Sequence, residues 1–180
     1  MSRKPSSPRK PRVVARTATT EDAPEIARLH IASWRATYIR ELPEDFLASQ
    51  DLEGRTARWQ ARFAEGVQVL VAEASGTLVG FVAFGPAHDP ESFKAGDWEI
   101  HNIHVEPSRH GQGIGRLLFE RAVGACRGHG AAGVMLWVVK TNAKARAFYE
   151  RMGMLSDGGE QEHTVQPGMV LHEVRYRTPL

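Results

Sequence analysis

Cysteine is almost absent from the sequence, which carries one, Cys126, in 180 residues. A single cysteine excludes an internal disulfide and any zinc site built on several cysteines. Cys126 lies near the end of an expected helix, beside Ala122 and Ala125. We therefore interpret it as a small buried hydrophobe, not as a nucleophile.

Long hydrophobic runs are also absent. No apolar stretch approaches the roughly 20 residues that a membrane-spanning helix needs. The N-terminus is basic but lacks the apolar segment of a secretory signal. We therefore expect a cytoplasmic protein with no membrane partner.

The sequence has little excess charge of either sign, with a formal net charge of +2. Much of that charge comes from basic residues near the N-terminus: Arg3, Lys4, Arg9, Lys10 and Arg12. Residues 1–11 have no hydrophobic residue after Met1, so we expect a disordered basic tail there. A single domain should follow over residues 12–180. Because that domain is near neutral, we expect no nucleic-acid partner.

The most informative stretch lies in the middle of the chain. Residues 98–105 alternate at period two and predict a strand. Three glycines, Gly111, Gly113 and Gly115, then lead into residues with helical spacing. The first turn of a helix has unpaired backbone N–H groups and positive potential, and glycines let a phosphate approach them. The loop is therefore a candidate pyrophosphate cradle, with a turn that only reverses the chain as the alternative.

Two better-known phosphate-binding loops are excluded by the same residues. A P-loop needs Gly-Lys-Ser/Thr, whereas Gly115 is followed by Arg116 and Leu117. The dinucleotide fingerprint needs GxGxxG, whereas this loop reads GxGxG. No acidic residue closes a second strand about 20 positions later, as that fingerprint also requires.

Two segments carry a resemblance to a known family. HGQGIG (His110–Gly115) resembles motif A of the GCN5-related N-acetyltransferase (GNAT) superfamily, whose consensus is Gln/Arg-x-x-Gly-x-Gly/Ala. LWVVKTNAKARAFYERMG (Leu136–Gly153) is similar to motif B, and the resemblance spans roughly residues 13–180. One position departs from the pattern, because His110 stands where the family has Gln or Arg.

The resemblance and the residue pattern predict the same fold, an α/β (α+β) domain. We expect a mostly antiparallel sheet of about seven strands, flanked by about four helices. We expect strands at 12–18, 67–74, 78–84, 98–105, 133–139, 155–165 and 170–178, and helices that begin near Thr20, Asp51, Ile114 and Asn142. In the GNAT fold the two central strands, here 98–105 and 133–139, splay apart, and their exposed edges hold the pantetheine arm of the cofactor.

The resemblance implies an acetyl-CoA-dependent N-acetyltransferase that acts on a primary amine by direct attack on the thioester. The expected cofactor-binding residues lie on the strand edge, in the glycine loop and on the motif B helix: Ile103, His104, Val105, His110, Gly111, Gln112, Gly113, Ile114, Gly115, Arg116, Asn142, Ala145 and Phe148. In the family Asn142 hydrogen-bonds the amide-rich arm of the cofactor.

The catalytic groups follow from the reaction. The amine must lose a proton before it attacks, and a strand N–H, which we place at Val105, can stabilise the oxyanion. By resemblance Tyr149 protonates the departing sulfur and Glu99 is the general base, with His101 acting through water as the other candidate. The alternatives are a core role for Tyr149 and a plain edge carboxylate for Glu99.

No metal is expected. Period two places Glu99, His101, Ile103 and Val105 on one face of the strand, and Ile100, Asn102 and His104 on the other. The two histidines would then diverge, which excludes a shared zinc ion. A bulge, as family members carry in this strand, would change the faces that follow it.

The acceptor should enter between residues 34–43 and the loop around Pro167. Trp34 and Tyr38 are the expected acceptor-binding residues, with core packing as the alternative, and several acidic residues lie near them: Glu41, Glu44, Asp45 and Glu99. Aromatic rings and carboxylates suit a small cationic amine.

Other readings stay open. One is a protein or peptide N-terminal acetyltransferase, although the strand before motif B lacks the glutamate of that group. Another is a non-catalytic acyl-CoA-binding module on the same fold. A homodimer is compatible with the sequence.

Overall fold

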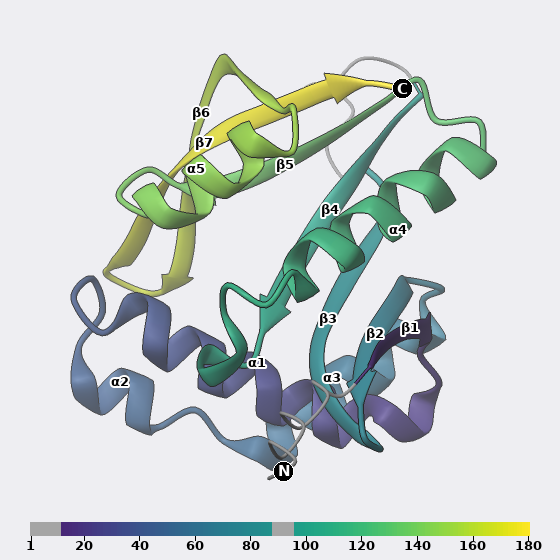
Figure 1. The fold of residues 1–180 in the computed structure, drawn as a ribbon. Coiled ribbons are helices and arrows are strands. Elements are labelled where there is room, and N and C mark those ends of the chain that lie inside the picture. Colours follow the sequence, from purple (N-terminus) through teal and green to yellow (C-terminus); the bar gives the residue numbers. More distant parts are fainter. Residues whose placement is uncertain (1–11, 88–95) are drawn as a thin grey trace, which may run out of the picture.

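The computed structural model describes residues 12–87 and 96–180, so the expected basic tail lies outside the described residues. Within these ranges the chain forms seven strands and five α-helices (Figure 1). In chain order they are β1 (Val13–Thr17), α1 (Ala23–Tyr38), α2 (Glu44–Ala48), α3 (Leu52–Ala64), β2 (Gln68–Ala74), β3 (Thr77–Pro86), β4 (Asp97–Val105), α4 (Ile114–Gly128), β5 (Gly133–Val139), α5 (Ala143–Arg151), β6 (Leu155–Gln166) and β7 (Met169–Pro179).

The strands form one sheet in the order β1-β2-β3-β4-β5-β7-β6. Every neighbouring pair is antiparallel except β4 and β5, which are parallel. The predicted mostly antiparallel sheet is confirmed. The short helix α2 is an addition to the four helices that we expected.

The parallel pair at the centre of the sheet separates after three residues. Asp97–Glu99 of β4 pair with Gly133–Met135 of β5, and the ladder ends there. Figure 1 shows the two strands meeting near the C-terminus and diverging toward the lower left. The predicted splay of the central strands is therefore confirmed, and it leaves the rest of the β4 edge unpaired on the β5 side.

Each face of the sheet carries its own hydrophobic core. On one face α4 packs against β3 and β4 through Ile114, Leu118 and Ala122, and the buried Cys126 lies in the same core. On the other face α1 and α3 pack against β2 and β3 through Ile26, Leu29 and Trp59, among others. No helix within residues 12–87 and 96–180 is long and apolar enough to cross a membrane.

The first helical segment begins where it was expected, at Thr20. A 3-10 turn over Thr20–Asp22, with Thr19 as its N-cap, leads directly into α1. The backbone N–H of Thr19 donates to Asp22 Oδ2 at 2.8 Å. This contact stabilises the start of the turn, because a carboxylate three residues ahead satisfies the amide that begins it.

A bulge in β4 overturns the predicted faces of that strand. Ala83 of β3 pairs with Asn102 and Phe84 with Ile100, so His101 is an extra residue on β4. After the bulge Ile103 and Val105 pack with the α4 core, on the face of Ile100. Asn102 and His104 instead contact groups of α3 and α1. The prediction that Ile103 and Val105 share a face with Glu99 was therefore wrong.

A third, smaller cluster joins α2 to strands β5, β6 and β7 of the sheet. Its buried members are Leu42, Leu47, Val139 and Leu171, and partly buried side chains pack against them: Trp34, Tyr38, Phe46, Val165 and Met169. The cluster brings the end of α1, helix α2 and the β6–β7 hairpin together at the end of β5.

Candidate active site

The loop between β4 and α4 has the geometry of an anion cradle. Gly111 and Gly113 have φ angles of +75° and +82°, a region that L side chains rarely adopt. No heavy atom lies within 4 Å of the position of a Cβ at either glycine, so the loop is open to a ligand. Gly113 precedes the first turn of α4, which contains no acidic residue. The backbone amides and the helix dipole therefore favour an anion here, and the residues fit the pyrophosphate of coenzyme A.

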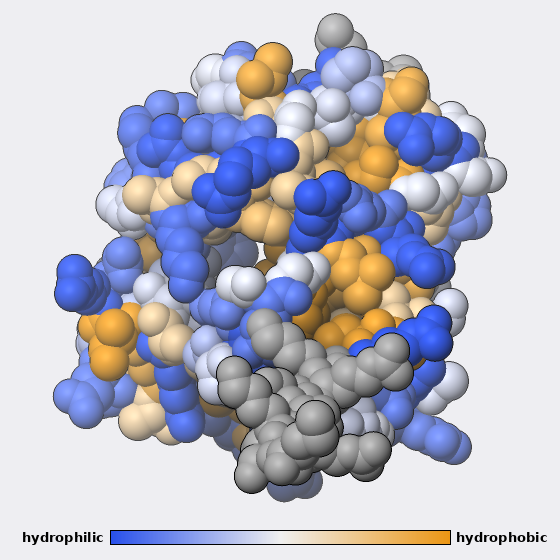
Figure 2. All heavy atoms as spheres, viewed as in Figure 1, coloured by the Kyte–Doolittle hydropathy of each residue, from blue (hydrophilic) through white to orange (hydrophobic). Residues whose placement is uncertain are grey.

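The groove beside this loop is lined by apolar side chains. A Cβ on Gly115 would lie 3.6 Å from the ring of Phe148 and 3.8 Å from Val105, so α4, α5 and β4 approach closely at that point. Figure 2 shows hydrophobic and near-neutral surface between the hydrophilic outer faces of α4 and α5, with a hollow beside the N-terminal end of α4.

The free edge of β4 faces the gap to β5. The N–H of Glu106 donates to Val79 O on the β3 side, at 2.9 Å. Because successive residues of a strand point their amides to opposite edges, the backbone groups of Val105 face the gap. The N–H of Val105 is thus on the edge where we expected the oxyanion donor.

The side chain of His110 joins three parts of the site. Its Nε2 lies 3.1 Å from Val105 O, and its Nδ1 lies 2.9 Å from the Nζ of Lys144, in the first turn of α5. The residue that departs from motif A therefore holds the glycine loop against both β4 and α5.

Asn142 begins α5 as its N-cap. Its Oδ1 accepts a hydrogen bond from Ala145 N at 3.0 Å, which fixes the first turn of the helix. The contact between Asn142 and the cofactor arm stays a prediction, and so do those of Ala145 and Phe148.

Tyr149 lies on the buried face of α5, and only 8% of the residue is exposed. Its ring contacts those of Phe148, Phe119 and Tyr176. Burial raises the pKa of the Tyr149 phenol, and the nearby Tyr38 raises it further. The phenol therefore stays protonated at neutral pH, as a proton donor must.

Glu99 and His101 lie together on the α3 side of β4. Glu99 Oε2 is 3.5 Å from His101 Nδ1, and both side chains are largely buried. Burial lowers the pKa of Arg62, whereas the carboxylates of Glu65 and Glu99 oppose that change. The guanidinium of Arg62 also donates to Asn102 Oδ1 at 2.7 Å. The two candidate bases are thus one contacting pair beside a cation.

The side chain of His104 lies on the α1 side of β4, away from the expected cofactor groove. Its Nδ1 lies 2.8 Å from Ser33 Oγ, and its ring centroid is 4.7 Å from that of His30. Burial, and secondarily the charge of Arg55, lowers the pKa of His104 to about 4. Only the backbone of His104 can therefore serve the cofactor on the β4 edge.

The argument that placed His101 and His104 on opposite faces was wrong, because the bulge puts both on the α1 and α3 side. Among the described residues, no group of three or more histidine, cysteine, aspartate or glutamate side chains has the arrangement of a metal site.

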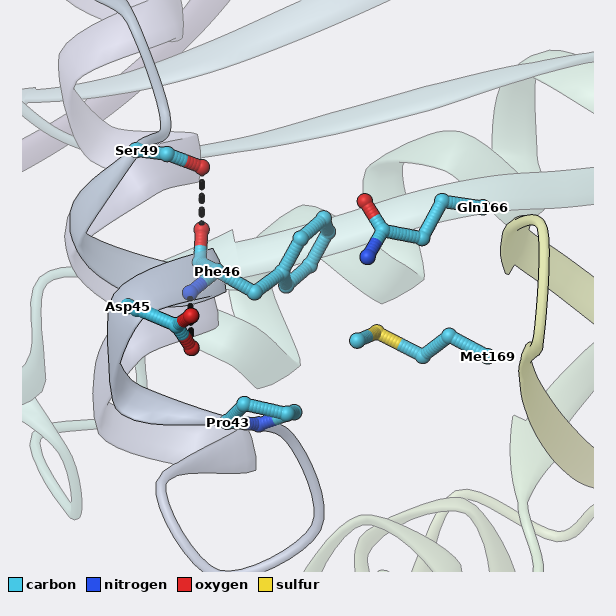
Figure 3. Close-up of a pocket in the computed structure, with 6 residues that line it drawn as sticks. All are labelled: Pro43, Asp45, Phe46, Ser49, Gln166 and Met169. Atoms are coloured by element: carbon cyan, nitrogen blue, oxygen red, sulfur yellow. Dashed lines mark hydrogen bonds between the residues drawn. The ribbon is translucent and has the colours of Figure 1, made fainter.

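The predicted acceptor region contains an open pocket of about 290 Å³ between α2 and the β6–β7 hairpin. Its lining residues are Pro43, Asp45, Phe46, Ser49, Gln166 and Met169 (Figure 3). Figure 3 shows the Phe46 ring pointing toward Gln166 and Met169 across the opening, with Asp45 and Ser49 on the α2 side. Of the acidic residues expected here, Asp45 lines the pocket, whereas Glu41 lies against Thr141.

The two predicted acceptor-binding aromatics lie behind this pocket. The rings of Trp34 and Tyr38 are 5.0 Å apart and edge to face, and both pack in the same cluster as Phe46 and Met169. Burial, followed by the charges of Glu173 and Glu41, raises the pKa of Tyr38 to about 12. Since Tyr38 also raises the pKa of Tyr149, the two phenols lie near each other.

Sequence reasoning missed Lys144, Phe46, Gln166 and Met169. A lysine in the first turn of a helix is an unusual choice, because the helix dipole disfavours a cation there, so Lys144 carried a usable signal. The other three carry none, since the pocket forms only when α2 meets a hairpin more than a hundred residues away.

Comparison with known proteins agrees with this geometry. The model of the acetyltransferase (GNAT) family matches residues 25–154. An uncharacterized N-acetyltransferase of Bacillus subtilis, YuaI, is 33% identical over 138 residues, which cover 77% of this chain and 78% of that protein. The L-methionine sulfoximine/L-methionine sulfone acetyltransferase of Salmonella typhimurium is 30% identical over 104 residues, 57% of this chain and 59% of that protein.

Among solved structures, the PaiA N-acetyltransferase of Thermoplasma acidophilum in complex with coenzyme A superposes with a TM-score of 0.72. The match has 19% sequence identity and covers 94% of this chain and 99% of the other. At this identity the likeness concerns the fold. Together with the glycine loop and the splayed strands, the family match leads to one conclusion: the chain belongs to the GNAT family and is an acetyl-CoA-dependent N-acetyltransferase.

Proposed function

We propose that the enzyme transfers the acetyl group to the primary amine of a small molecule, without a metal ion. The pocket between α2 and the β6–β7 hairpin is the observation that carries this proposal. Its volume of about 290 Å³ is near the lower limit of small-molecule sites, so a compact acceptor suits it better than a folded protein surface.

The chemistry of the pocket supports a cationic acceptor with an apolar body. Phe46, Met169 and Pro43 provide apolar walls, and the carboxylate of Asp45 is the acidic group among the lining residues. Asp45 Oδ1 accepts from Phe46 N at 2.9 Å, and a carboxylate retains further lone pairs for a ligand. The relative named as an L-methionine sulfoximine/L-methionine sulfone acetyltransferase makes amino-acid derivatives the first compounds to test.

The donor would lie along the free edge of β4 and over the glycine loop. Acetyl-CoA supplies the acetyl group as an activated thioester. The backbone N–H of Val105 is positioned on the gap side to stabilise negative charge on the carbonyl oxygen under attack. The amides of residues 110–116 bind the phosphates, and Ile103, Ala145 and Phe148 line the groove for the arm.

Two proton transfers remain for side chains. Tyr149, whose burial keeps the phenol protonated, donates a proton to the leaving sulfur. Both groups of the Glu99–His101 pair lie on the α3 side of β4 and not in the groove itself. The pair therefore takes the proton of the amine through a water molecule.

The test is a competition. A mixed panel of amino-acid derivatives, polyamines, aminoglycosides and short peptides is offered at equal concentration with acetyl-CoA, and products are ranked by kcat/KM. A small amine should lead the ranking, and Asp45→Asn with Phe46→Ala should lower kcat/KM for that amine by at least tenfold. Ser6→Ala, a change in the N-terminal segment, is the control. If peptides lead by tenfold or more and the pocket variants leave the ranking intact, the acceptor is a protein N-terminus.

A further inference from the structure

The contact between His110 and Lys144 has a defined proton arrangement. Val105 O can only accept, so the Nε2 of His110 must carry the proton and donate it. Nδ1 then presents a lone pair, which accepts from the ammonium of Lys144 at 2.9 Å. A neutral imidazole thus holds a lysine in place without neutralising its charge.

That charge lies where the protein alone disfavours it. Lys144 is in the first turn of α5, at the positive end of the helix dipole, and no acidic residue occupies that turn. The first turn of α4 likewise contains no acid and carries Arg116, whose Nε is paired with Glu120 at 2.7 Å. Within the described ranges, no carboxylate is paired with Lys144. Two helix starts and a retained cation therefore border the glycine loop, an arrangement that an anion would stabilise.

We propose that Lys144, positioned by His110, binds the pyrophosphate of coenzyme A. Of the phosphates of the cofactor, the pyrophosphate is assigned because His110 directly precedes Gly111 and the amides of the cradle. The inference depends on the proposed placement of the cofactor at this loop. Lys144 is a cofactor-binding residue in this scheme, and His110 is a positioning residue that acts through it.

The test is the dissociation constant of coenzyme A, measured by isothermal titration calorimetry without turnover. Lys144→Met should raise it by about tenfold, since a charge-assisted hydrogen bond to phosphate is lost. Lys144→Arg should keep most of the affinity. Lys140→Met is the matched control, because Lys140 precedes the same helix but pairs with Glu160, and it should leave the constant unchanged.

Two further measurements separate the parts of the proposal. The Lys144→Met change should weaken the binding of dephospho-coenzyme A, which lacks the 3′-phosphate, as much as it weakens the binding of coenzyme A. A loss confined to coenzyme A would overturn the pyrophosphate assignment. His110→Ala should weaken binding, and combining it with Lys144→Met should add nothing to the effect of Lys144→Met alone. Additive losses would overturn the positioning role of His110.

The outcome also distinguishes this inference from the proposed placement of the cofactor. Wild-type protein that binds coenzyme A, together with a Lys144→Met variant of equal affinity, contradicts the role of Lys144 only. If Gly113→Asp also leaves the affinity intact, the placement over the loop is wrong and this inference fails with it.

Discussion

The guanidinium of Arg177 donates to both carboxylate oxygens of Asp97, at 2.6 and 2.8 Å, although their strands are not neighbours in the sheet. Strand β5 lies between β7 and β4, and the pair passes over Gly133 at its start. A Cβ on Gly133 would lie 2.7 Å from Asp97 Oδ1. Asp97 is 3% exposed, so the pair is well shielded from water at the closed end of the splay.

Gly133→Ala should therefore destabilise the protein, because the new methyl group must push Asp97 away from Arg177. We expect a loss of about 2 kcal/mol in the free energy of unfolding, measured by urea denaturation. Gly124→Ala is the control: this glycine is in α4 with open space around it, and alanine should stabilise the helix by about 0.5–1 kcal/mol. Equal effects of the two changes would show that Gly133 is not needed for the ion pair.

Tyr149→Phe removes the hydroxyl and keeps the packing of the ring. If the phenol protonates the leaving sulfur, kcat should fall by roughly 10²-fold while the affinity for coenzyme A stays constant. Because burial raises the pKa of Tyr149, the rate of the wild-type enzyme should show no loss from ionisation of this group up to pH 9 at least. A variant with wild-type kcat would assign Tyr149 to the core alone.

Gly113→Asp places a carboxylate at the mouth of the expected phosphate cradle. The dissociation constant of acetyl-CoA should rise at least tenfold, or about 1.4 kcal/mol. Gly113→Asn has nearly the same shape and tolerates the left-handed conformation about as well, so it reports the strain without the charge. Similar losses in the two variants would mean that conformation, not repulsion of phosphate, determines binding.

Glu99→Gln and His101→Gln discriminate between the two candidate bases. Changing the residue that accepts the proton should lower kcat/KM by about 10²-fold. The decline of kcat/KM at low pH should then also become smaller, because the base that would be protonated is gone. Changing the other residue should lower kcat/KM less, because that residue only holds its partner in place. If both variants retain full kcat/KM, the pair has a structural role at the β4 bulge and no role as a base.

Stability should fall in mild acid because of the buried His104. Burial lowers the pKa of this imidazole to about 4, whereas a histidine in the unfolded chain takes up a proton near pH 6.5. The stabilisation is therefore complete above about pH 6.5 and is lost as the pH falls toward 4, by up to about 3 kcal/mol. His30, whose pKa is also lowered by burial, changes stability in the same direction.

Urea denaturation between pH 7 and pH 4.5 tests this expectation. His104→Gln should flatten the dependence of the unfolding free energy on pH. His172→Gln removes a histidine whose side chain is 69% exposed, and it should leave the slope unchanged. An unchanged slope for His104→Gln would assign the acid sensitivity to other groups.

Elements with a strong local signal could be predicted closely from the sequence. The sequence predicts strand β5 at Gly133–Val139, as the structure has it, because a nearly uninterrupted apolar run of this length is typical of a strand buried on both faces. Similarly, the glycine loop and the start of α4 follow from residue types whose backbone preferences are strong.

Features that depend on pairing between distant strands could not be predicted in the same way. The bulge at His101 is a property of the register with β3, and the sequence of β4 alone alternates as if it were regular. The contact between His110 and Lys144 joins residues 34 positions apart, and the pocket at α2 needs the β6–β7 hairpin.

The small cluster around Leu42, Leu47, Val139 and Leu171 has a consequence for how the enzyme diversifies. The wall beside the proposed acceptor pocket packs in this cluster, whereas Ile114, at the end of the glycine loop, and Tyr149 belong to the α4 core on the sheet. If the proposed pocket binds the acceptor, substitutions in residues 39–50 or 165–170 should alter amine selectivity while the donor half of the enzyme keeps its packing. On the same condition, grafting these two segments from a relative should give a chimaera with a new acceptor range and an unchanged affinity for coenzyme A.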